Sequence, residues 1–206
     1  MTRSEINAFF VSLPSDAVYG LCDRTLLDTY SLTPETYADL CRKLGVKLIQ
    51  YRSKTETADA VAEELKRLRS AWEGVLIVND HWRLHALCDG VHVGQDDLLT
   101  FGEDPCEAAA ALRAAVGSDC ILGLSTHNAR EIETANLLPL DYIGLGAFRA
   151  TGTKDDAAVL GTDLDTLAAA SVHPVAAIGG VGFDDRFEHA RMRVMGSALM
   201  REGTWK

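Results

Sequence analysis

The 206-residue chain is 47% hydrophobic and 24% charged, a balance typical of a globular protein with one sizeable core. Its formal net charge of −10 argues against a general binder of nucleic acids or anionic membranes, because such proteins are basic. Any cations that take part in chemistry must therefore form a local positive site on an acidic protein.

The five cysteines are widely spaced and form no CxxC pair, which predicts reduced, structural thiols. The N-terminal segment lacks the apolar region of a signal peptide, and no run approaches the roughly 18 apolar residues of a membrane span. We therefore expect a cytoplasmic protein with small-molecule substrates and with neither membrane nor nucleic-acid partners.

Short apolar runs recur along the chain and predict eight β-strands, at about residues 17–22, 46–51, 75–79, 90–93, 120–125, 141–145, 174–178 and 193–197. Most are apolar on both faces, as in a parallel sheet that is covered on both sides. Helical patterns lie between them. The first begins with Thr33 as N-cap and Pro34 in the first turn, and it ends at Gly45. The others span residues 57–72, 104–117 (ending in Gly117), 128–138 (with Asn128 as N-cap) and 164–172.

This alternation of strand and helix predicts an α/β fold, a (β/α)₈ TIM barrel in a single domain of residues 1–206. The barrel is expected at about residues 16–200, after an N-terminal extension of residues 1–15. The C-terminal helices are shortened, with only a brief helix near residues 184–191. A doubly wound open sheet is the alternative, but it does not explain why polar residues follow nearly every strand. In a barrel those strand ends form one mouth, where the active site lies.

Two kinds of charged side chain follow the predicted strands. The cations Arg52, Lys54 and Lys154 suit a substrate that carries several phosphate charges. The carboxylates Asp80 and Asp97 follow adjacent strands and suit Mg²⁺, which takes one or two protein carboxylates together with water and phosphate oxygens.

Glycine-containing pairs follow the last two strands, at Gly179-Gly180 and Gly196-Ser197. In barrels, backbone N–H groups at this position commonly hold a phosphate. The whole pattern indicates a diphosphate-and-metal site beside a monophosphate site. It predicts chemistry between two phosphorylated small molecules, with pyrophosphate as the leaving group.

Other interpretations stay open for single residues. Arg52 and Lys54 could be surface residues in ion pairs, and Asp96-Asp97 could simply be the N-cap of a helix. His92 is expected to be a packed residue inside the barrel. His127 could be a base at the mouth or a neighbour of a helix cap.

From about Tyr19 to Leu199 the chain resembles the thiamine-phosphate synthase family. The segments that carry the resemblance are YGLCD, QYRSK, VND, DGVHVGQDDL, GLSTH, YIGLGAF with TGTK, and AIGGV. They are similar to the family's QxRxK, ND, GQxD and TxTK patterns in the same order, and that combination is specific.

The resemblance implies a Mg²⁺-dependent transferase. This family joins 4-amino-5-hydroxymethyl-2-methylpyrimidine diphosphate to a thiazole phosphate or to its carboxylated form, and gives thiamine phosphate and pyrophosphate. Its implied catalytic residues are Arg52, Lys54, Lys154 and Ser125. The diphosphate is bound by these four and by Asn79. By the same carry-over, Asp80 and Asp97 hold Mg²⁺, Gln50 contacts the pyrimidine, Thr151 and Thr153 line the thiazole side, and Gly180, Gly196 and Ser197 hold the thiazole phosphate.

The implied mechanism is dissociative: pyrophosphate departs ahead of bond formation, from a carbon whose cation the aminopyrimidine stabilises. It needs no protein nucleophile and no role for His127. The sequence departs from the family pattern at Ser53, Ala147, Arg149 and Ala150, and Arg149 could add a further cation.

Two rival functions remain. The related thiazole tautomerase would use His127 as acid and base, and it would need neither the metal carboxylates nor Arg52 and Lys54. A non-catalytic ligand-binding paralogue is the second rival. The short C-terminal region could also be covered by a second copy of the chain in a homo-oligomer.

Overall fold

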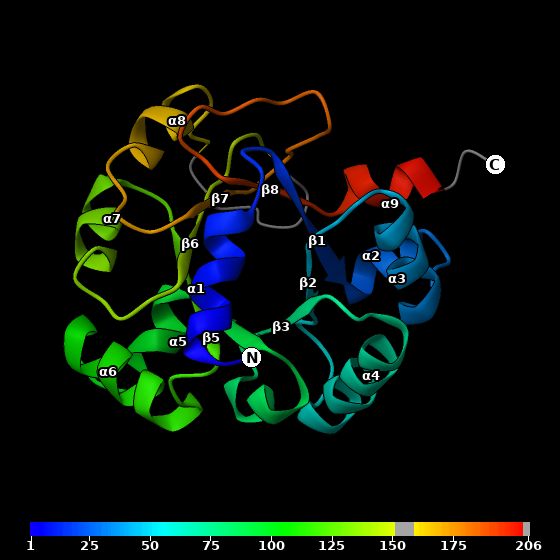
Figure 1. Ribbon diagram of the computed structural model, residues 1–206, viewed down its shortest axis with the longest axis horizontal. Coiled ribbons are helices and arrows are strands. Elements are labelled where there is room, and N and C mark those ends of the chain that lie inside the picture. The colour runs from blue at the N-terminus through cyan, green and yellow to red at the C-terminus, as the bar shows by residue number, and fades with distance from the viewer. Residues whose placement is uncertain (151–158, 204–206) are drawn as a thin grey trace.

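Eight parallel strands close into a barrel in chain order, and helices surround it (Figure 1). The computed structural model describes residues 1–150 and 159–203. The strands are β1 (Ala17–Asp23), β2 (Leu48–Arg52), β3 (Val75–Asn79), β4 (Gly90–Val93), β5 (Ile121–Thr126), β6 (Tyr142–Leu145), β7 (Val175–Ala177) and β8 (Met192–Met195). All eight predicted strands and the TIM barrel are confirmed, and β8 pairs with β1 to close the sheet. The open doubly wound sheet is therefore wrong.

The predicted helices and their caps are also largely confirmed. They are α3 (Pro34–Lys43), α4 (Ala58–Ala71), α6 (Pro105–Val116), α7 (Ala129–Ala135) and α8 (Asp163–Ala168). The side chains of Thr33 and Asn128 accept N–H bonds as N-caps, and Gly45 adopts φ 68°, a left-handed conformation that glycine allows without strain. The remaining described helices are α1 (Arg3–Ser12), α2 (Arg24–Thr29), the 3₁₀ helix η1 (Trp82–Leu87), α5 (Gln95–Leu99) and α9 (Ser197–Gly203).

The period of two along each strand divides the core into two parts. On β2, Ile49 and Tyr51 point outward into the cluster between strands and helices, while Leu48 joins Tyr19 and Ile77 inside the barrel. Every second residue near the carboxyl end of a strand therefore faces the mouth.

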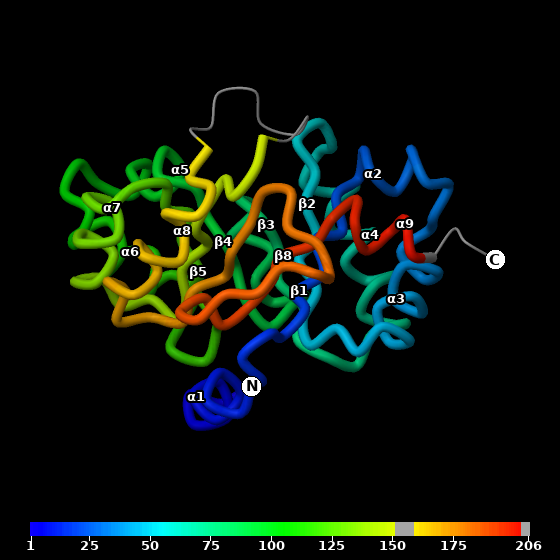
Figure 2. Tube along the Cα trace, turned by 90° about the horizontal axis from the view of Figure 1, so that it is seen from above, coloured from blue at the N-terminus to red at the C-terminus, as the bar shows by residue number. Residues whose placement is uncertain are grey.

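Helix α1 closes the end of the barrel opposite the mouth, and the sequence did not predict it (Figure 2). Its Phe10 ring stacks on Tyr142, with 5.7 Å between ring centroids. Arg3 forms an ion pair with the buried Asp141, which also accepts from Arg113 at 2.7 Å. The expected N-terminal extension is thus largely a helix that seals the interior.

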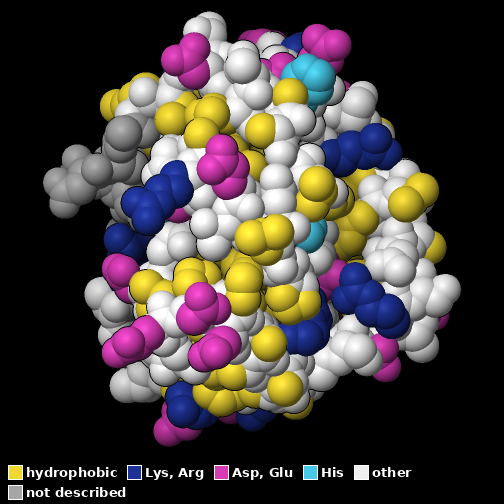
Figure 3. Space-filling view, turned by 90° about the vertical axis from the view of Figure 1, so that its left-hand side faces the viewer, with side chains coloured by type: hydrophobic (Ala, Val, Ile, Leu, Met, Phe, Trp, Pro, Cys, Tyr) yellow, Lys and Arg dark blue, Asp and Glu magenta, His cyan; other side chains and the backbone are white. Residues whose placement is uncertain are grey.

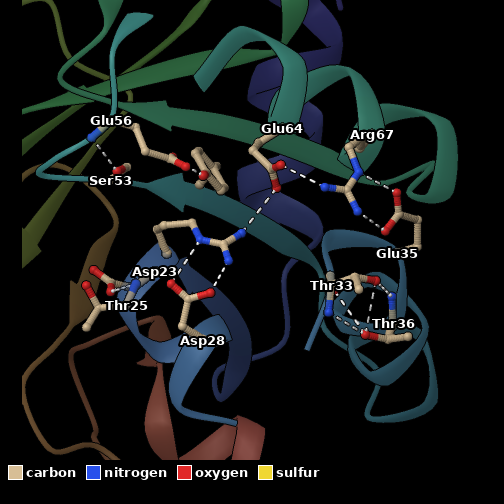
Figure 4. A network of polar contacts seen from close by, with 12 residues as sticks. Asp23, Thr25, Asp28, Thr33, Glu35, Thr36, Ser53, Glu56, Glu64 and Arg67 are labelled. Atoms are coloured by element: carbon tan, nitrogen blue, oxygen red, sulfur yellow. Dashed lines mark hydrogen bonds and ion pairs between the residues drawn. The ribbon is translucent and has the colours of Figure 1, made fainter. Parts of the chain in front are cut away.

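Polar contacts tie the outer helices together on one side of the barrel (Figure 4). Arg67 of α4 forms two 2.8 Å hydrogen bonds to Glu35 of α3 and one of 2.7 Å to Glu64. The bond from Arg67 lowers the pKa of Glu35 to about 2. These pairs are partly exposed, so they set the position of the helices more than they stabilise the fold.

The face that carries α6 and α7 shows acidic and basic side chains interspersed with apolar ones (Figure 3). This face thus presents no continuous basic surface. Among the described residues, no helix has the length and apolarity needed to cross a membrane.

The helix predicted near residues 184–191 is wrong, because that segment forms turns and bends. Side-chain carboxylates satisfy its backbone instead. Asp165 of α8 accepts from the N–H groups of Glu188, His189 and Ala190 at 2.8–3.2 Å, and Asp185 accepts from Gly182 at 2.8 Å.

We expect Asp165→Ala to destabilise the protein by about 1–2 kcal/mol, because three N–H groups lose their acceptor. Burial raises the pKa of this carboxyl, but the hydrogen bonds from Glu188, His189 and Ala190 outweigh it and the folded pKa is lowered. The stabilisation is therefore present above the unfolded pKa, and it is lost as the pH falls below about 4. Urea unfolding at pH 7 and pH 3 measures this, with the exposed Asp163→Ala as the control. Equal losses at both pH values would contradict it.

Candidate active site at the carboxyl ends of the strands

The segment QYRSK continues β2 into the mouth, and its alternation is visible in its contacts. Gln50 and Arg52 share the inward face, whereas Tyr51 and Ser53 point to the helix layer. The Tyr51 hydroxyl donates to Glu56 at 2.6 Å, and Ser53 Oγ accepts from the Glu56 N–H at 3.1 Å (Figure 4). Ser53 thus anchors the loop after β2 from the outside, so this departure from the family pattern adds no group to the inward face.

Arg52 is held by a carboxylate on the neighbouring strand. Its Nη1 donates to Oδ2 of Asp23 at 2.6 Å, and Asp23 and Arg52 are paired in the β1–β2 register. Oδ1 of Asp23 also caps α2 by accepting from the N–H groups of Thr25 and Leu26. Arg52 is therefore in an ion pair, as one alternative proposed, but that pair is largely buried at the mouth, with Asp23 buried and Arg52 partly so. Lys54 lies exposed just beyond, at the rim.

Asp23 is a site residue that sequence reasoning missed. It ends the segment YGLCD, and its inward register could have been derived from the strand period. Because the α2 cap holds Asp23 in place, its carboxylate positions the Arg52 guanidinium through Nη1, the one Arg52 donor whose bond is described.

Asp80 and Asp97 line the same cleft, of about 290 Å³, together with residues of η1 and with Ala58 and Thr100. Asp80 follows β3 with φ 62°, an uncommon conformation for a residue other than glycine and one often found at functional sites. Asp97 also accepts from the Gly94 N–H at 3.3 Å, so the helix-cap interpretation is correct in part. No cluster of three or more possible metal ligands occurs among the described residues. Two carboxylates in one cleft nonetheless fit the limited protein contribution that Mg²⁺ requires.

Asn79 and Ser125 end the inward faces of β3 and β5. Asn79 is buried and pairs in register with His92 of β4. His92 is itself buried, as expected, and its Nε2 lies 2.9 Å from Ser125 Oγ. The Ser125 carbonyl accepts from Gln95 at 2.6 Å. Arg52, Asn79 and Ser125 thus come from nearby strands and face one mouth.

The glycines after β7 bring the β6 loop against them. Gly179 and Gly180 have φ 94° and 65°, and an added Cβ would lie 2.6 Å from Ala147 and 2.8 Å from Arg149, respectively. Arg149 is an exposed residue whose guanidinium donates to both Asp185 oxygens and to the Gly180 carbonyl. It thus braces the β6 and β7 loops. These contacts do not show Arg149 as the further cation at the ligand that the sequence suggested.

The strands β7 and β8 are neighbours, so Gly180 lies on the same side of the barrel as Gly196 and Ser197. Ser197 begins α9, where the first backbone N–H groups have no acceptor within the helix. The predicted residues Thr151, Thr153 and Lys154 lie outside the described residues.

His127 follows β5 and contacts the first turn of α7. Both its backbone N–H and its Nδ1 lie within 2.9 Å of Glu131 Oε2. These contacts favour the interpretation as the neighbour of a helix cap.

Comparison with known proteins agrees with this geometry. The family model described as thiamine monophosphate synthase matches residues 19–202. The chain belongs to this family. It is an enzyme of the transferase class.

Individual relatives support the assignment. A thiamine-phosphate synthase of Persephonella marina is 36% identical over 174 residues, which cover 80% of this chain and 77% of that protein. One from Dictyoglomus thermophilum is 34% identical, over 77% of this chain and 74% of the relative. A shorter match, to the enzyme of Azorhizobium caulinodans, is 43% identical over 55% of this chain and spans 51% of that relative.

Solved structures support the fold. A thiamine phosphate pyrophosphorylase from Pyrococcus furiosus superposes with a TM-score of 0.69 at 23% identity, over 89% of this chain and 87% of the other. A phosphonopyruvate hydrolase shares the architecture with a TM-score of 0.65 at only 11% identity.

Proposed function

We propose that the protein is a cytoplasmic thiamine-phosphate synthase. It joins 4-amino-5-hydroxymethyl-2-methylpyrimidine diphosphate to a thiazole phosphate and releases pyrophosphate. The observation that carries the proposal is the convergence of Arg52, Asn79 and Ser125 on one mouth, beside the cleft of Asp80 and Asp97, in a chain of this family.

The charged residues act on the leaving group. Pyrophosphate gains negative charge as its bond to the exocyclic carbon breaks, and fixed donors aimed at that charge lower the barrier. Arg52 supplies a guanidinium already oriented by Asp23, and Asn79 and Ser125 supply neutral donors. Lys54 and Lys154 would add charge in this proposal, and Lys154 lies outside the described residues.

Asp80 and Asp97 would hold Mg²⁺. When bound, the ion would neutralise phosphate charge and orient the diphosphate. The two carboxylates would bind the ion, and their negative charge would attract it to the cleft.

The second substrate requires orientation more than chemical activation. The thiazole nitrogen already carries a lone pair, so no protein base is needed, and holding it in line with the departing group supplies the catalysis. We assign its phosphate to the backbone at Gly180, Gly196 and Ser197, and its ring to the side of Thr151 and Thr153. Gln50 meets the pyrimidine.

A turnover assay tests the proposal. The purified protein receives both substrates with and without Mg²⁺, and thiamine phosphate and pyrophosphate are followed. We expect product with Mg²⁺ and at least a 100-fold lower rate in EDTA, restored by added Mg²⁺.

The rivals give different results in the same assay. Proton exchange on the thiazole that EDTA does not affect, and that His127→Asn abolishes, would favour the tautomerase. Ligand binding without turnover of either substrate would favour the binding paralogue.

A further inference from the structure

A chain of hydrogen bonds crosses the barrel interior between two of the site residues. Gln50 Nε2 donates to the Tyr19 hydroxyl at 2.7 Å, and the Tyr19 and Tyr142 hydroxyls lie 2.9 Å apart. Tyr142 lies 2.9 Å from His92 Nδ1, and His92 Nε2 lies 2.9 Å from Ser125 Oγ. The chain thus joins five strands and ends at the mouth on both sides.

The number of hydrogens allows this chain of hydrogen bonds to have only one donor-to-acceptor direction at a time. Each phenol has a single hydrogen, so when His92 is neutral and every hydrogen in the chain is paired, each phenol accepts from one neighbour and donates to the other. If Gln50 donates to Tyr19, then Tyr19 donates to Tyr142 and Tyr142 donates to Nδ1 of a neutral His92. Nε2 of His92 then carries the hydrogen and donates to Ser125.

This direction determines what the two ends offer to a ligand. The Ser125 hydroxyl, already accepting from His92, is left to donate its hydrogen into the mouth. At the other end the Gln50 carbonyl oxygen is left as an acceptor. In the reverse direction both ends change. The Ser125 hydroxyl donates its hydrogen to His92, and Gln50 turns its amino group, not its carbonyl oxygen, toward the ligand.

We propose that Tyr19 and Tyr142 are positioning residues that couple two ligand subsites: a group with N–H donors bound at Gln50 favours an oxyanion bound at Ser125, and the oxyanion favours the donor. The inference rests on the proposed function, in which the aminopyrimidine and the diphosphate are these two groups. Neither tyrosine needs to touch a substrate.

Two glycines leave the space that the rings of this hydrogen-bond chain occupy. A Cβ on Gly123 would lie 2.3 Å from the Tyr142 ring and 2.5 Å from His92 Nδ1, and one on Gly144 would lie 3.2 Å from the His92 ring. Gly123, the glycine of the GLSTH segment, thus makes room for the two rings, and the hydrogen-bond chain ends at Ser125 of the same segment. Helix α1 closes the far end through Phe10, so water is kept from the phenols.

The two phenols also remain protonated, because burial raises the pKa of both Tyr19 and Tyr142 well above their ordinary value. Each hydroxyl therefore keeps one donor and can still accept, as a directional chain requires.

The test measures binding of two fragments by calorimetry, with the free pyrimidine alcohol and with inorganic pyrophosphate plus Mg²⁺. In the unaltered protein, each fragment should tighten binding of the other by about tenfold, since coupling is reciprocal. In Tyr142→Phe and Tyr19→Phe, each fragment should still bind alone but the coupling should fall to about one. Tyr37→Phe, which removes a buried phenolic hydroxyl from the outer core, is the matched control and should keep the coupling.

A spectroscopic readout tests the direction itself. With pyrophosphate bound, ¹⁵N NMR should show His92 as the neutral Nε2–H tautomer, and Tyr142→Phe should abolish that preference. Coupling that persists in the folded Tyr142→Phe protein would overturn the inference. A His92 that carries its hydrogen on Nδ1 while the protein has pyrophosphate bound would overturn it as well. Two fragments that bind the unaltered protein independently would overturn the coupling alone. Failure of both fragments to bind would overturn the proposed function and this inference together.

Discussion

Arg52→Ala should lower kcat about 100- to 1000-fold with both substrates saturating, the size of effect seen when one fixed donor to a developing anion is removed. The loss should lie mainly in kcat, because the leaving group carries more negative charge in the transition state than in the bound substrate. Arg52→Lys should recover only part of the rate, since an ammonium retains the charge but loses the forked geometry that Asp23 orients.

The design must separate chemistry from folding. Arg52→Ala leaves the buried Asp23 without its ion pair, which can destabilise a protein by several kcal/mol. The double variant Arg52→Ala with Asp23→Asn removes that charge while keeping a good N-cap for α2. Arg42→Ala, on the exposed face of α3, is the control. A stable double variant with full activity would remove Arg52 from the mechanism.

The second large effect is expected at the two acids of the cleft. Asp80→Asn and Asp97→Asn should each raise the Mg²⁺ concentration for half-maximal activity at least tenfold, and the pair together should reduce activity at 1 mM Mg²⁺ by about 1000-fold. The physical reason is that the proposed ion loses charged ligands, and a neutral amide replaces them poorly. Titration of activity against Mg²⁺ measures this.

Asp96→Asn supplies the matched control, because Asp96 is exposed and adjacent to Asp97 and does not line the cleft. It should leave the Mg²⁺ titration unchanged. Asp97 also accepts from the Gly94 N–H, so its variant needs a thermal unfolding curve beside the kinetics. An unchanged titration in both Asp80→Asn and Asp97→Asn would refute a metal site at this cleft.

The barrel could be predicted from the sequence because its signals are local. A strand that is buried on both faces is a continuous apolar run, and Thr33, Asn128 and Gly117 mark helix ends through their own hydrogen bonds or backbone angles. Closure followed from counting eight such units.

Two segments were not predictable in the same way. Helix α1 has a weak pattern of its own, and it is fixed by contacts with residues more than 100 positions away, such as Arg3 with Asp141. The segment at 184–191 carries helix-forming residues, but Asp165 supplies acceptors for its backbone from another element. Tertiary partners decided both outcomes.

The site residues show the same difference between local signals and tertiary partners. Gln50, Arg52, Asn79 and Ser125 were predicted as site residues, and the strand period places them on inward faces. The roles of Asp23 and Arg149 depended on partners across strands or loops, which spacing along the chain does not reveal. What Gln50 and Arg52 bind remains a prediction.

The placement of α1 also matters for using the protein as a component. Residues ahead of the helix emerge on the side of the barrel away from the mouth (Figure 2). A resin, an electrode or a second enzyme joined ahead of Thr2 would therefore leave the entrance open. The tether should spare Thr2 itself, since Thr2 and Glu5 cap each other at the start of the helix. Attachment at the loop after β2, beside Lys54, would instead obstruct the entrance.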